Sequence, residues 1–419
     1  MADGSIKLTS DARERAYATP LEAFRVDDPE LFRTDTHWPW FERLRAEDPV
    51  HWCPDSDFGP YWSVTRFNDI IAVDGAQQVF SSSSELGGIT IFDGVEEKSR
   101  TSFIGLDPPD HEAERRVVTP MFSTASMAAM APLIRERAAR ILDELPVGET
   151  FDFVDKVSIE LTSQMLATLF DFPFEHRRVL PRASDLILTT PGPGGLVETE
   201  EERQGEMFAT FSQFMALWNE RKGAPPRNDL ISMLANGDAT ASEDPYEYMG
   251  NIVLLTVAGS DTTRHSISGA LVAFNKHPDV YERLRRDPSL LETAVPEIIR
   301  WQTPVAHMRR TALADYELGG KTIKTGDKVV MWYVSGNRDE TVIDNPEAFV
   351  IDRPRPRQHL SFGFGVHRCL GNRLAEMQLK IVWEEILKRF SFIEIIGEPR
   401  RLRSNFIKGY EAMPVRIAG

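Results

Sequence analysis

The sequence contains very little cysteine: 2 residues, Cys53 and Cys369, among 419. Two cysteines so far apart cannot form the disulfide framework of a small secreted domain or a four-ligand zinc site. Each therefore needs a local explanation. Cys53, in HWCPDSDFG, is most simply a small buried side chain. Cys369 has a different neighbourhood, because FGFGVHRCLG surrounds it with glycines, a histidine and an arginine.

Long hydrophobic runs are also missing. The longest, Ile252–Ala258, is far shorter than the roughly 18 residues that a membrane-spanning helix needs. The first twenty residues contain no apolar targeting core. We therefore expect a cytoplasmic protein without a membrane anchor.

Basic residues are outnumbered, with 48 lysines and arginines against 64 acidic residues and a net charge of −16. This balance argues against a general nucleic-acid binder, because phosphate contacts need an excess of cations on one face. The hydrophobic content of 42% and the charged content of 27% are ordinary for a soluble globular protein. The chain can therefore bury a large core.

No internal repeat and no long linker divides the chain. Helical periodicity dominates, as in 372–390, where Leu374, Met377, Ile381, Ile386 and Phe390 share one face. Strand-like stretches are few and short: 61–66, 316–334 and 390–396. We predict a flexible segment at 1–20 and one mainly α-helical domain at 21–419, with a small β-rich lobe assembled from both ends of the chain. Pro191–Gly195 reads as a mobile loop between two helices.

The surroundings of Cys369 suit a metal ligand. A thiolate is stabilised at a helix N-terminus, and the periodic helix begins just after this residue. Gly363 and Gly365 let the backbone turn sharply and approach a large flat group. A lone thiolate with His367 nearby fits an axial ligand to haem iron, with the histidine directed at a porphyrin carboxylate.

Taken singly, these features are better explained by a buried cysteine beside a glycine-rich turn. The combination is far more specific, because its chance occurrence at this composition is on the order of one in a million. Its members are Phe362, Gly363, Gly365, Arg368, Cys369 and Gly371.

At these residues the chain resembles the cytochrome P450 superfamily, the haem-thiolate monooxygenases. In that family the phenylalanine, the glycines, the basic residue and the cysteine form the loop beneath the haem. The resemblance implies a single, largely helical, roughly triangular domain with a small β-rich lobe. It also implies haem b bound through Cys369, with Phe362 and Gly363 in the binding loop, and dioxygen as co-substrate.

Glu297 and Arg300, in EIIRW, are three residues apart, the spacing at which helical side chains meet as an ion pair. Other pairs with this spacing are explained as solvated surface contacts: Glu42/Arg45, Glu112/Arg115, Glu200/Arg203 and Glu282/Arg285. Only Glu297/Arg300 stands at the family's distance before the cysteine, and the resemblance makes Arg353 the third member of a structural Glu-Arg-Arg core. Pro296 lacks an N–H, so the helix either begins there or is kinked.

Asp261 and Thr262, in AGSDTTR, end the most apolar helical stretch. A threonine hydroxyl inside a helix can bond the carbonyl one turn back, which for Thr262 belongs to Ala258. The resemblance places this helix over the distal haem face, with space left by Ala258 and Gly259. It assigns Thr262 and Asp261 to proton delivery during O–O cleavage, with Arg182 as a candidate partner of Asp261. Without the cysteine loop, a polar end to a hydrophobic helix would be the simpler interpretation.

DPPDHEAERR begins at Asp107, which can cap a helix whose first turn tolerates two prolines. His111 and Arg115 then lie four apart on one helix face. The resemblance implies that both bind haem propionates, as do Arg310 and His367. Surface cations on an acidic protein are the alternative. If a haem is bound, the better explanation is that these basic groups converge on its two carboxylates.

Electrons for this chemistry must come from another protein, because the chain has no G-x-G-x-x-G segment for a flavin or nicotinamide. We expect a ferredoxin to donate these electrons after it is reduced by a ferredoxin reductase and NAD(P)H. We also expect the protein to be a monomer. Four cations near Cys369 are candidates for its docking face, or else ordinary solvated charges: Arg357, Arg368, Arg373 and Lys380.

The expected pocket segments are mainly apolar, so a hydrophobic substrate is predicted. The candidate contacts are Ile89, Ile91, Leu255, Val257, Val305, His307 and Met308. Longer stretches, such as EIIRWQTPVAHMRRTALADYELGGKTI, resemble the soluble bacterial branch that hydroxylates alkanes and fatty acids at the terminal carbon. Ser260 and His265 depart from the asparagines associated with that branch.

The leading hypothesis is therefore a ferredoxin-dependent terminal hydroxylase of alkanes or fatty acids. The alternative within the superfamily is a hydroxylase of terpenes or steroids, which product analysis would distinguish. From other classes come a non-catalytic haem protein that binds or senses gas, and a haem-free helical binding protein. A thiolate-type carbon monoxide spectrum would exclude the last of these.

Overall fold

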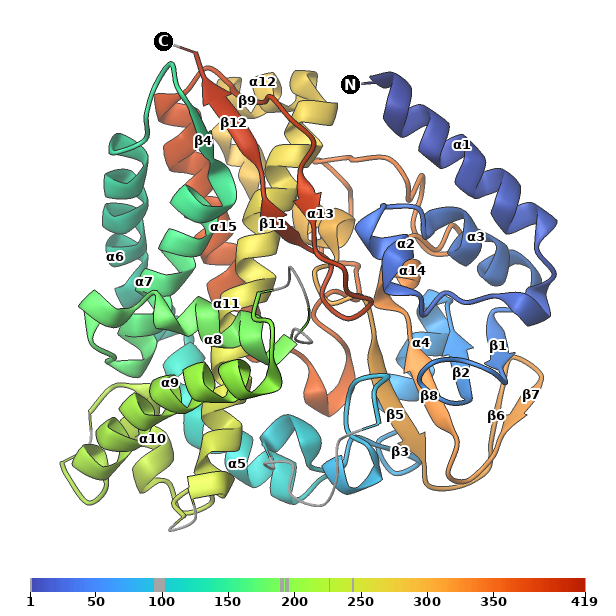
Figure 1. Cartoon of the computed structure of the whole chain (residues 1–419), viewed down its shortest axis with the longest axis horizontal. Coiled ribbons are helices and arrows are strands. Elements are labelled where there is room, and N and C mark those ends of the chain that lie inside the picture. The colour runs from blue at the N-terminus through green and yellow to red at the C-terminus, as the bar shows by residue number, and fades with distance from the viewer. Residues whose placement is uncertain are drawn as a thin grey trace.

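The computed structural model describes residues 2–93, 102–188, 192, 196–225, 227–242 and 245–418, and in 2–9 and 245–247 it describes the backbone alone. Helices dominate it (Figure 1). Their bounds are α1 Ala2–Ala18, α2 Pro29–Arg33, α3 Trp38–Glu47, α4 Phe67–Gly75, α5 Asp110–Val118, α6 Thr124–Asp143, α7 Glu160–Phe170, α8 Val179–Leu188, α9 Glu200–Arg221, α10 Leu230–Asn236, α11 Pro245–Lys276, α12 Pro278–Arg286, α13 Leu291–Gln302, α14 Tyr333–Gly336 and α15 Asn372–Arg389.

The strands are short. Their bounds are β1 Val50–Cys53, β2 Tyr61–Val64, β3 Phe80–Ser81, β4 Thr150–Asp152, β5 Met308–Ala312, β6 Tyr316–Leu318, β7 Lys321–Ile323, β8 Lys328–Met331, β9 Ile393–Ile395, β10 Arg400–Arg401, β11 Tyr410–Ala412 and β12 Pro414–Ile417. The largest sheet has the order β1-β2-β8-β5-β3, so it combines strands from both ends of the chain. β2 runs parallel to β8, with Trp62 opposite Val329. This confirms the prediction of an interwoven β region in one mainly helical domain.

Helix α11 runs through the middle of the molecule (Figure 1) and contacts α7, α8, α13 and α15. Its apolar side chains enter the main hydrophobic core, which joins these helices to α6. Ser158 and Ser268 share a buried hydroxyl contact of 2.8 Å where the π-helical turn before α7 crosses α11. A helix held on several sides by a packed core is a rigid platform for the residues along it.

The structure differs from the sequence predictions at several points. Much of the segment expected to be flexible forms helix α1, and Arg13 pairs with Glu42 of α3 at 2.8 Å. The predicted strand at 316–334 ends early, because Tyr333 begins the short helix α14. Most of Pro191–Gly195, predicted as a mobile loop, lies outside the described residues.

Among the described residues, no single helix is long and apolar enough to cross a membrane. One pair, Asp110–Phe122 with Thr124–Asp143, passes that test together by length and composition, although the two parts are bent by 48°.

Candidate active site

The loop that carries Cys369 is fixed by its own backbone and by helix α4. The N–H of Cys369 donates to the carbonyl of Phe362 at 2.8 Å. Gly363 and Gly365 both have φ of +65°, a conformation that side chains rarely tolerate. A Cβ atom at Gly365 would lie 2.3 Å from the carbonyl oxygen of Asp74. Gly363 lines the central cavity, but Gly365 is required by the close approach of α4 rather than by a cofactor.

Cys369 opens into this cavity, together with Phe362, Gly363 and His367 of the same loop. Burial raises the pKa of its thiol, while the backbone N–H of Gly371 and the guanidinium groups of Arg115 and Arg368 lower it. These donors and cations favour a thiolate, which is the form that binds metal. Helix α15 begins at Asn372, directly after the loop, as the sequence predicted.

Unpartnered histidine nitrogens gather at one side of the cavity. Both ring nitrogens of His111 and Nδ1 of His367 are buried without a hydrogen-bond partner among the described residues. The two rings lie 4.2 Å apart, centroid to centroid. Burial, followed by Arg310, His111 and Arg115, lowers the pKa of His367 to about 2. Buried polar atoms normally have partners, so this cluster indicates a missing acceptor such as a carboxylate.

Arg115 and Arg310 line the same side. Arg115 donates from Nη2 to the carbonyl of Arg368 at 2.5 Å, which ties α5 to the cysteine loop. The four basic residues, the glycine-lined loop and the lone sulfur together fit a haem, with His111, Arg115, Arg310 and His367 facing its propionates.

Arg310 has a protein partner that the sequence did not reveal. Its Nη2 donates to Oδ1 of Asp74 at 2.6 Å, and both side chains are almost fully buried. The other carboxylate oxygen of Asp74 accepts from the hydroxyl of Tyr333 at 2.7 Å and from the N–H of Phe364 at 2.9 Å. One carboxylate therefore connects a propionate-facing arginine to the cysteine loop.

Asp107 does not cap helix α5, which begins at Asp110. Its carboxylate instead accepts from the Ser81 hydroxyl and from the N–H of Ser82, the latter at 2.8 Å. Asp107 therefore joins the segment before α5 to β3, while the helix still presents His111 and Arg115 to the cavity.

Thr262 of α11 also lines the cavity, with Ala258 and Gly259. The Thr262 hydroxyl donates to the carbonyl of Ala258 at 2.9 Å, as predicted. Gly259 has an additional reason to be glycine, because a Cβ atom there would lie 2.6 Å from Leu166 Cδ2. This glycine lets α7 pack closely against α11.

Asp261 lies next to Thr262 but is fully buried. Burial raises the pKa of its carboxyl, and the charge of Arg264 opposes this increase. Arg264 Nη2 lies 2.9 Å from Asp261 Oδ1 and also pairs with Asp185 of α8. The predicted pairing with Arg182 is therefore wrong, because Arg182 binds Glu206 of α9 at 2.8 Å.

Glu297, Arg300 and Arg353 form the buried core that was predicted. Arg300 donates to both carboxylate oxygens of Glu297 at 2.7 and 2.8 Å, and Arg353 donates to Glu297 at 2.9 Å. Arg300 also donates to the carbonyls of Asn337, Pro346 and Ala348. Helix α13 begins at Leu291, so Pro296 lies inside the helix and not at its start.

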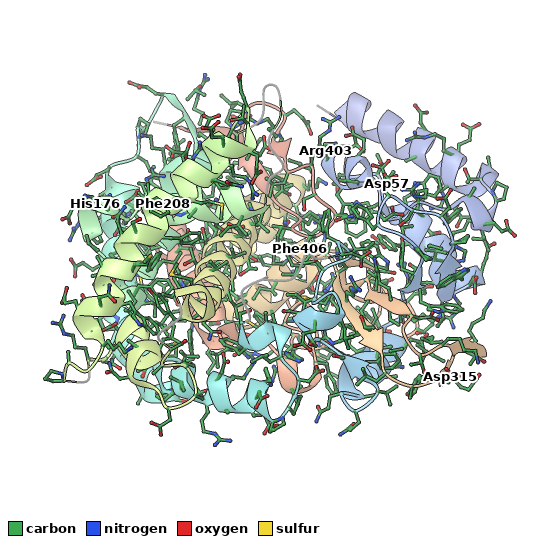
Figure 2. All side chains as sticks on the ribbon, turned by 60° about the horizontal axis from the view of Figure 1, so that its bottom comes forward. Asp57, His176, Phe208, Asp315, Arg403 and Phe406 are labelled. Carbon is green, nitrogen blue, oxygen red and sulfur yellow. The ribbon has the colours of Figure 1, made fainter. Side chains whose placement is uncertain are left out.

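Four of the seven candidate substrate contacts line the cavity: Ile89, Leu255, Val305 and Met308. Ile91, Val257 and His307 are absent from its lining. His307 Nδ1 lies 2.8 Å from the carbonyl of Asn405, and its Nε2 accepts from the N–H of Ile91 at 3.1 Å. Phe406, whose ring contacts His307, is labelled near the middle of the view in Figure 2. Adjacent side chains of an extended segment point to opposite sides, which explains why His307 points away where its neighbour Met308 lines the cavity.

The cavity has apolar walls that were not singled out individually, including Phe103, Met165, Leu166 and Leu169. The last three come from helix α7, whose apolar periodicity does not distinguish a core side from a cavity side. Ser260 and His265, the two departures noted in the sequence, are buried and are not among the lining residues. His265 accepts from the N–H of Tyr410 at 3.2 Å.

The four cations near the cysteine loop have different surroundings. Arg357 pairs with Glu376 at 2.7 Å, and Lys380 pairs with Glu292. Arg368 and Arg373 are exposed and have no carboxylate of the described residues within ion-pair distance. Of the four candidates, these two are the ones without such an ion pair in the described part of the chain.

Sequence comparison gives many relatives. A family model described as Cytochrome P450 matches residues 200–406. The chain is 37% identical to linalool 8-monooxygenase of Pseudomonas putida, across 94% of this chain and 99% of that relative. It is 32% identical to a steroid C26-monooxygenase of Rhodococcus jostii, across 96% of this chain and 87% of the relative.

Solved structures agree in fold. Cytochrome P450-153 from Novosphingobium aromaticivorans superposes with a TM-score of 0.87 at 44% identity, over 94% of this chain and 98% of its own. CYP153D17 from Sphingomonas sp. PAMC 26605 gives 0.88 at 45% identity, over 96% and 100%. The cysteine loop, the buried Glu-Arg-Arg core and these full-length similarities lead to one conclusion. The chain belongs to the cytochrome P450 family, with haem b held by the axial thiolate of Cys369 and dioxygen as co-substrate.

Proposed function

We propose that this protein hydroxylates the terminal carbon of alkanes or fatty acids with electrons from a ferredoxin. The observation that carries the proposal is the cavity itself. Apolar side chains line much of it. They come from Phe103, from one face of α7, from Leu254 and Leu255 of α11, and from the segment that ends at Met308. Such walls bind a hydrocarbon chain and provide few groups to orient a polar head.

The haem, when bound, supplies reductive activation of dioxygen and transfer of one oxygen atom to the substrate. The protein's own residues set the conditions for this chemistry. Thr262 presents a hydroxyl to the cavity from α11. Asp261, buried one residue away beside Arg264, is placed to move a proton between the α8–α11 contact and the Thr262 side of the cavity.

Terminal attack is supported by the names of the relatives. Carbon 8 of linalool and carbon 26 of a sterol are both methyl carbons at the end of an open chain, and the two enzymes named for these positions match almost the whole chain. A terminal C–H bond is stronger than its internal neighbours, so selectivity requires walls that present only the methyl end. The resemblance of the longer sequence stretches to alkane and fatty-acid hydroxylases then favours an unbranched substrate.

A product screen tests this proposal. The holoenzyme is incubated with a surrogate ferredoxin, its reductase and NADPH, and with octane, dodecanoic acid, linalool or a 3-keto sterol. We expect 1-octanol and 12-hydroxydodecanoic acid as the main products by gas chromatography with mass detection. Turnover of linalool or the sterol alone, or oxidation mainly at internal carbons, would contradict it.

The second candidate is a terpene or steroid hydroxylase, and the linalool and steroid enzymes among the relatives favour it. A further solved relative, at 32% identity, is a Mycobacterium marinum cytochrome P450 in complex with pseudoionone. The same screen distinguishes this candidate, because it predicts selective oxidation of linalool.

The proposed electron donor is a ferredoxin that docks beside the cysteine loop. Arg368 and Arg373 are exposed there, and Arg368 is next to the haem ligand in the chain. Acidic ferredoxins are attracted to such a basic face even when the whole protein is acidic, because nearby charges dominate the interaction. We propose that the enzyme works as a monomer.

A further inference from the structure

A second cavity, of about 250 Å³, lies apart from the haem cavity and shares none of its lining residues. Its walls come from the start of α3, the end of α11, the end of α13, the residues after α14 and the approach to β11. Five charged residues line it: Asp35, Lys276, Arg338, Glu347 and Lys408. This cavity has no role in the function proposed above.

Positive charge predominates around the cavity. Lys276, Arg338 and Lys408 line it, and Arg401 lies 3.4 Å from Asp35 at its edge. The carboxylates that line the cavity are Asp35 and Glu347, and Arg401 at the edge also pairs with Glu398 at 3.3 Å. The Glu347 side chain is 65% exposed, whereas the Arg338 side chain is only 3% exposed. The buried positive charge is therefore only partly balanced.

Arg338 has hydrogen-bonding capacity that the protein does not use. Its Nη2 donates to the carbonyl of Trp301 at 3.1 Å. Its Nε and Nη1 are buried and have no hydrogen-bond partner in the part of the chain that the structure describes, and Nε is 3.4 Å from Glu347 in poor alignment. The guanidinium lies over Trp38, 4.7 Å from the ring centroid, so its plane is held in place. A fixed guanidinium with two unsatisfied donor nitrogens can bind an oxyanion.

Lys408 supports the same interpretation. Its Nζ donates to the carbonyl of Gln302 at 2.8 Å. Burial lowers the pKa of this amine to about 7; Asp35 opposes the shift, and Arg338, Arg401 and Lys276 add to it. A bound anion would offset both the burial and the repulsion between cations.

We propose that this cavity binds one small oxyanion, either inorganic phosphate or a short carboxylate, between Arg338, Lys408 and Lys276. Three cations from different elements would then share one ligand.

The proposed site also has a structural connection to the cysteine loop. Arg338 follows Asn337, whose carbonyl accepts from Arg300 at 2.8 Å. The side chain of Asn337 accepts from the N–H of Leu360 and donates to the hydroxyl of Ser361. An anion bound to Arg338 would hold the chain beside these contacts. We therefore expect it to stabilise the folded holoenzyme.

Phosphate titration of the holoenzyme tests the proposal. Thermal melting and calorimetric titration are carried out at pH 7, with sodium chloride keeping the ionic strength constant. We expect a saturable rise in melting temperature and binding of one phosphate per chain, because a ligand that binds only the folded state stabilises it. A parallel titration with succinate shows whether phosphate or carboxylate is preferred.

Lys276→Met is the main variant, because Lys276 is exposed at the rim and its loss leaves the core intact. It should weaken phosphate binding about tenfold while the haem spectrum stays unchanged. Arg338→Met should abolish binding. Lys324→Met removes an exposed lysine paired with Asp315 and should bind phosphate like the wild type. No saturable binding of either anion by the wild type, or equal phosphate affinity in Lys276→Met and the wild type, would overturn the proposal.

Discussion

At the scale of single residues, the Thr262 hydroxyl combines a structural bond with access to the cavity. Thr262→Ala removes the hydroxyl that would hold a proton near the reacting oxygen. We expect NADPH consumption to continue while hydroxylated product falls about tenfold or more, with peroxide released instead. The ratio of product to NADPH consumed, with peroxide measured in parallel, tests this.

Thr256→Ala is a matched control on the same helix. Its hydroxyl donates to the carbonyl of Ile252 at 2.8 Å, the same one-turn-back bond, but Thr256 is not among the cavity-lining residues. The control should keep tight coupling of NADPH to product. Equal uncoupling in both variants would mean that the helical bond, and not the cavity hydroxyl, explains the effect.

Asp74 does not line the haem pocket, but it supports residues that do. Asp74→Asn leaves the buried Arg310 without its anion and weakens the bond to Phe364 of the cysteine loop. Breaking one partner of a buried ion pair typically costs about 3–5 kcal/mol. We expect the variant to lose its haem at a lower urea concentration and to rebind it more slowly when the urea is removed. The Soret band measures both.

Asp315→Asn provides the comparison. This aspartate lies at the outer edge of the molecule in Figure 2 and pairs with the exposed Lys324. Its loss should change stability little, because exposed pairs contribute little. If both variants behaved alike, the assignment of Asp74 as the support of Arg310 would be wrong.

Residue identity in the cysteine loop and in the Glu-Arg-Arg core was predictable, because short specific spacings carry those motifs. Asp74 was not predictable, whereas Arg264 stands three residues after Asp261, at the same helical spacing, and was overlooked. Asp74 precedes Arg310 by more than two hundred residues, and no local pattern links them. The wrong choice of Arg182 has the same origin, since only the packing of α8 brings Asp185 to Arg264 of α11 and Arg182 to Glu206 of α9.

At the scale of elements, His307 joins the segment before β5 to Ile91 and Asn405. Burial lowers its pKa from 6.5 to about 4. Between these values the unfolded chain binds a proton that the folded chain does not, so stability falls as pH falls from about 6.5 to 4. This histidine alone lowers the free energy of unfolding by about 3 kcal/mol over that pH range. Below the folded pKa there is no further loss from it.

His307→Gln should be less stable than the wild type at pH 7 but should lose less stability on acidification to pH 4.5. Urea unfolding at several pH values measures both quantities. His176→Gln, a change at an outer edge of the molecule (Figure 2), should keep the slope of the wild type. An unchanged slope in His307→Gln would show that other buried groups cause the acid sensitivity.

Long helices and the hairpin at 316–323 were predictable because apolar periodicity and turn residues are local signals. Strands such as β3 and β10, which have two residues each, carry no detectable period. Helix α1 was missed for a related reason: its segment is polar, and packing on α3 together with the Arg13–Glu42 pair stabilises it. Such elements form because of tertiary contacts and not because of the local preference of their residues.

At the scale of the whole molecule, charge is unevenly distributed: the chain is acidic, yet Arg368 and Arg373 are exposed near the cysteine loop and pair with no carboxylate among the described residues. Arg373→Glu should weaken ferredoxin binding about tenfold at low ionic strength, with a smaller effect at high salt. The dependence of turnover on ferredoxin concentration, measured at two salt concentrations, tests this.

Arg403→Glu is the control, since Arg403, labelled in Figure 2, follows β10 and has an exposed side chain. It changes net charge by the same amount but should leave the ferredoxin dependence close to that of the wild type. Equal effects of the two substitutions would show that total charge, and not a docking face, governs the interaction.

The strand order β1-β2-β8-β5-β3 also affects biosynthesis. The β1–β2 hairpin leaves the ribosome early, but its neighbour β8 begins only at Lys328. At 5–20 residues per second, one edge of β2 stays without its partner for roughly 13–50 s. During that interval the exposed edge is a site for pairing with other nascent chains. The yield of folded enzyme should therefore depend on chaperone supply and translation speed more than on the stability of the finished protein.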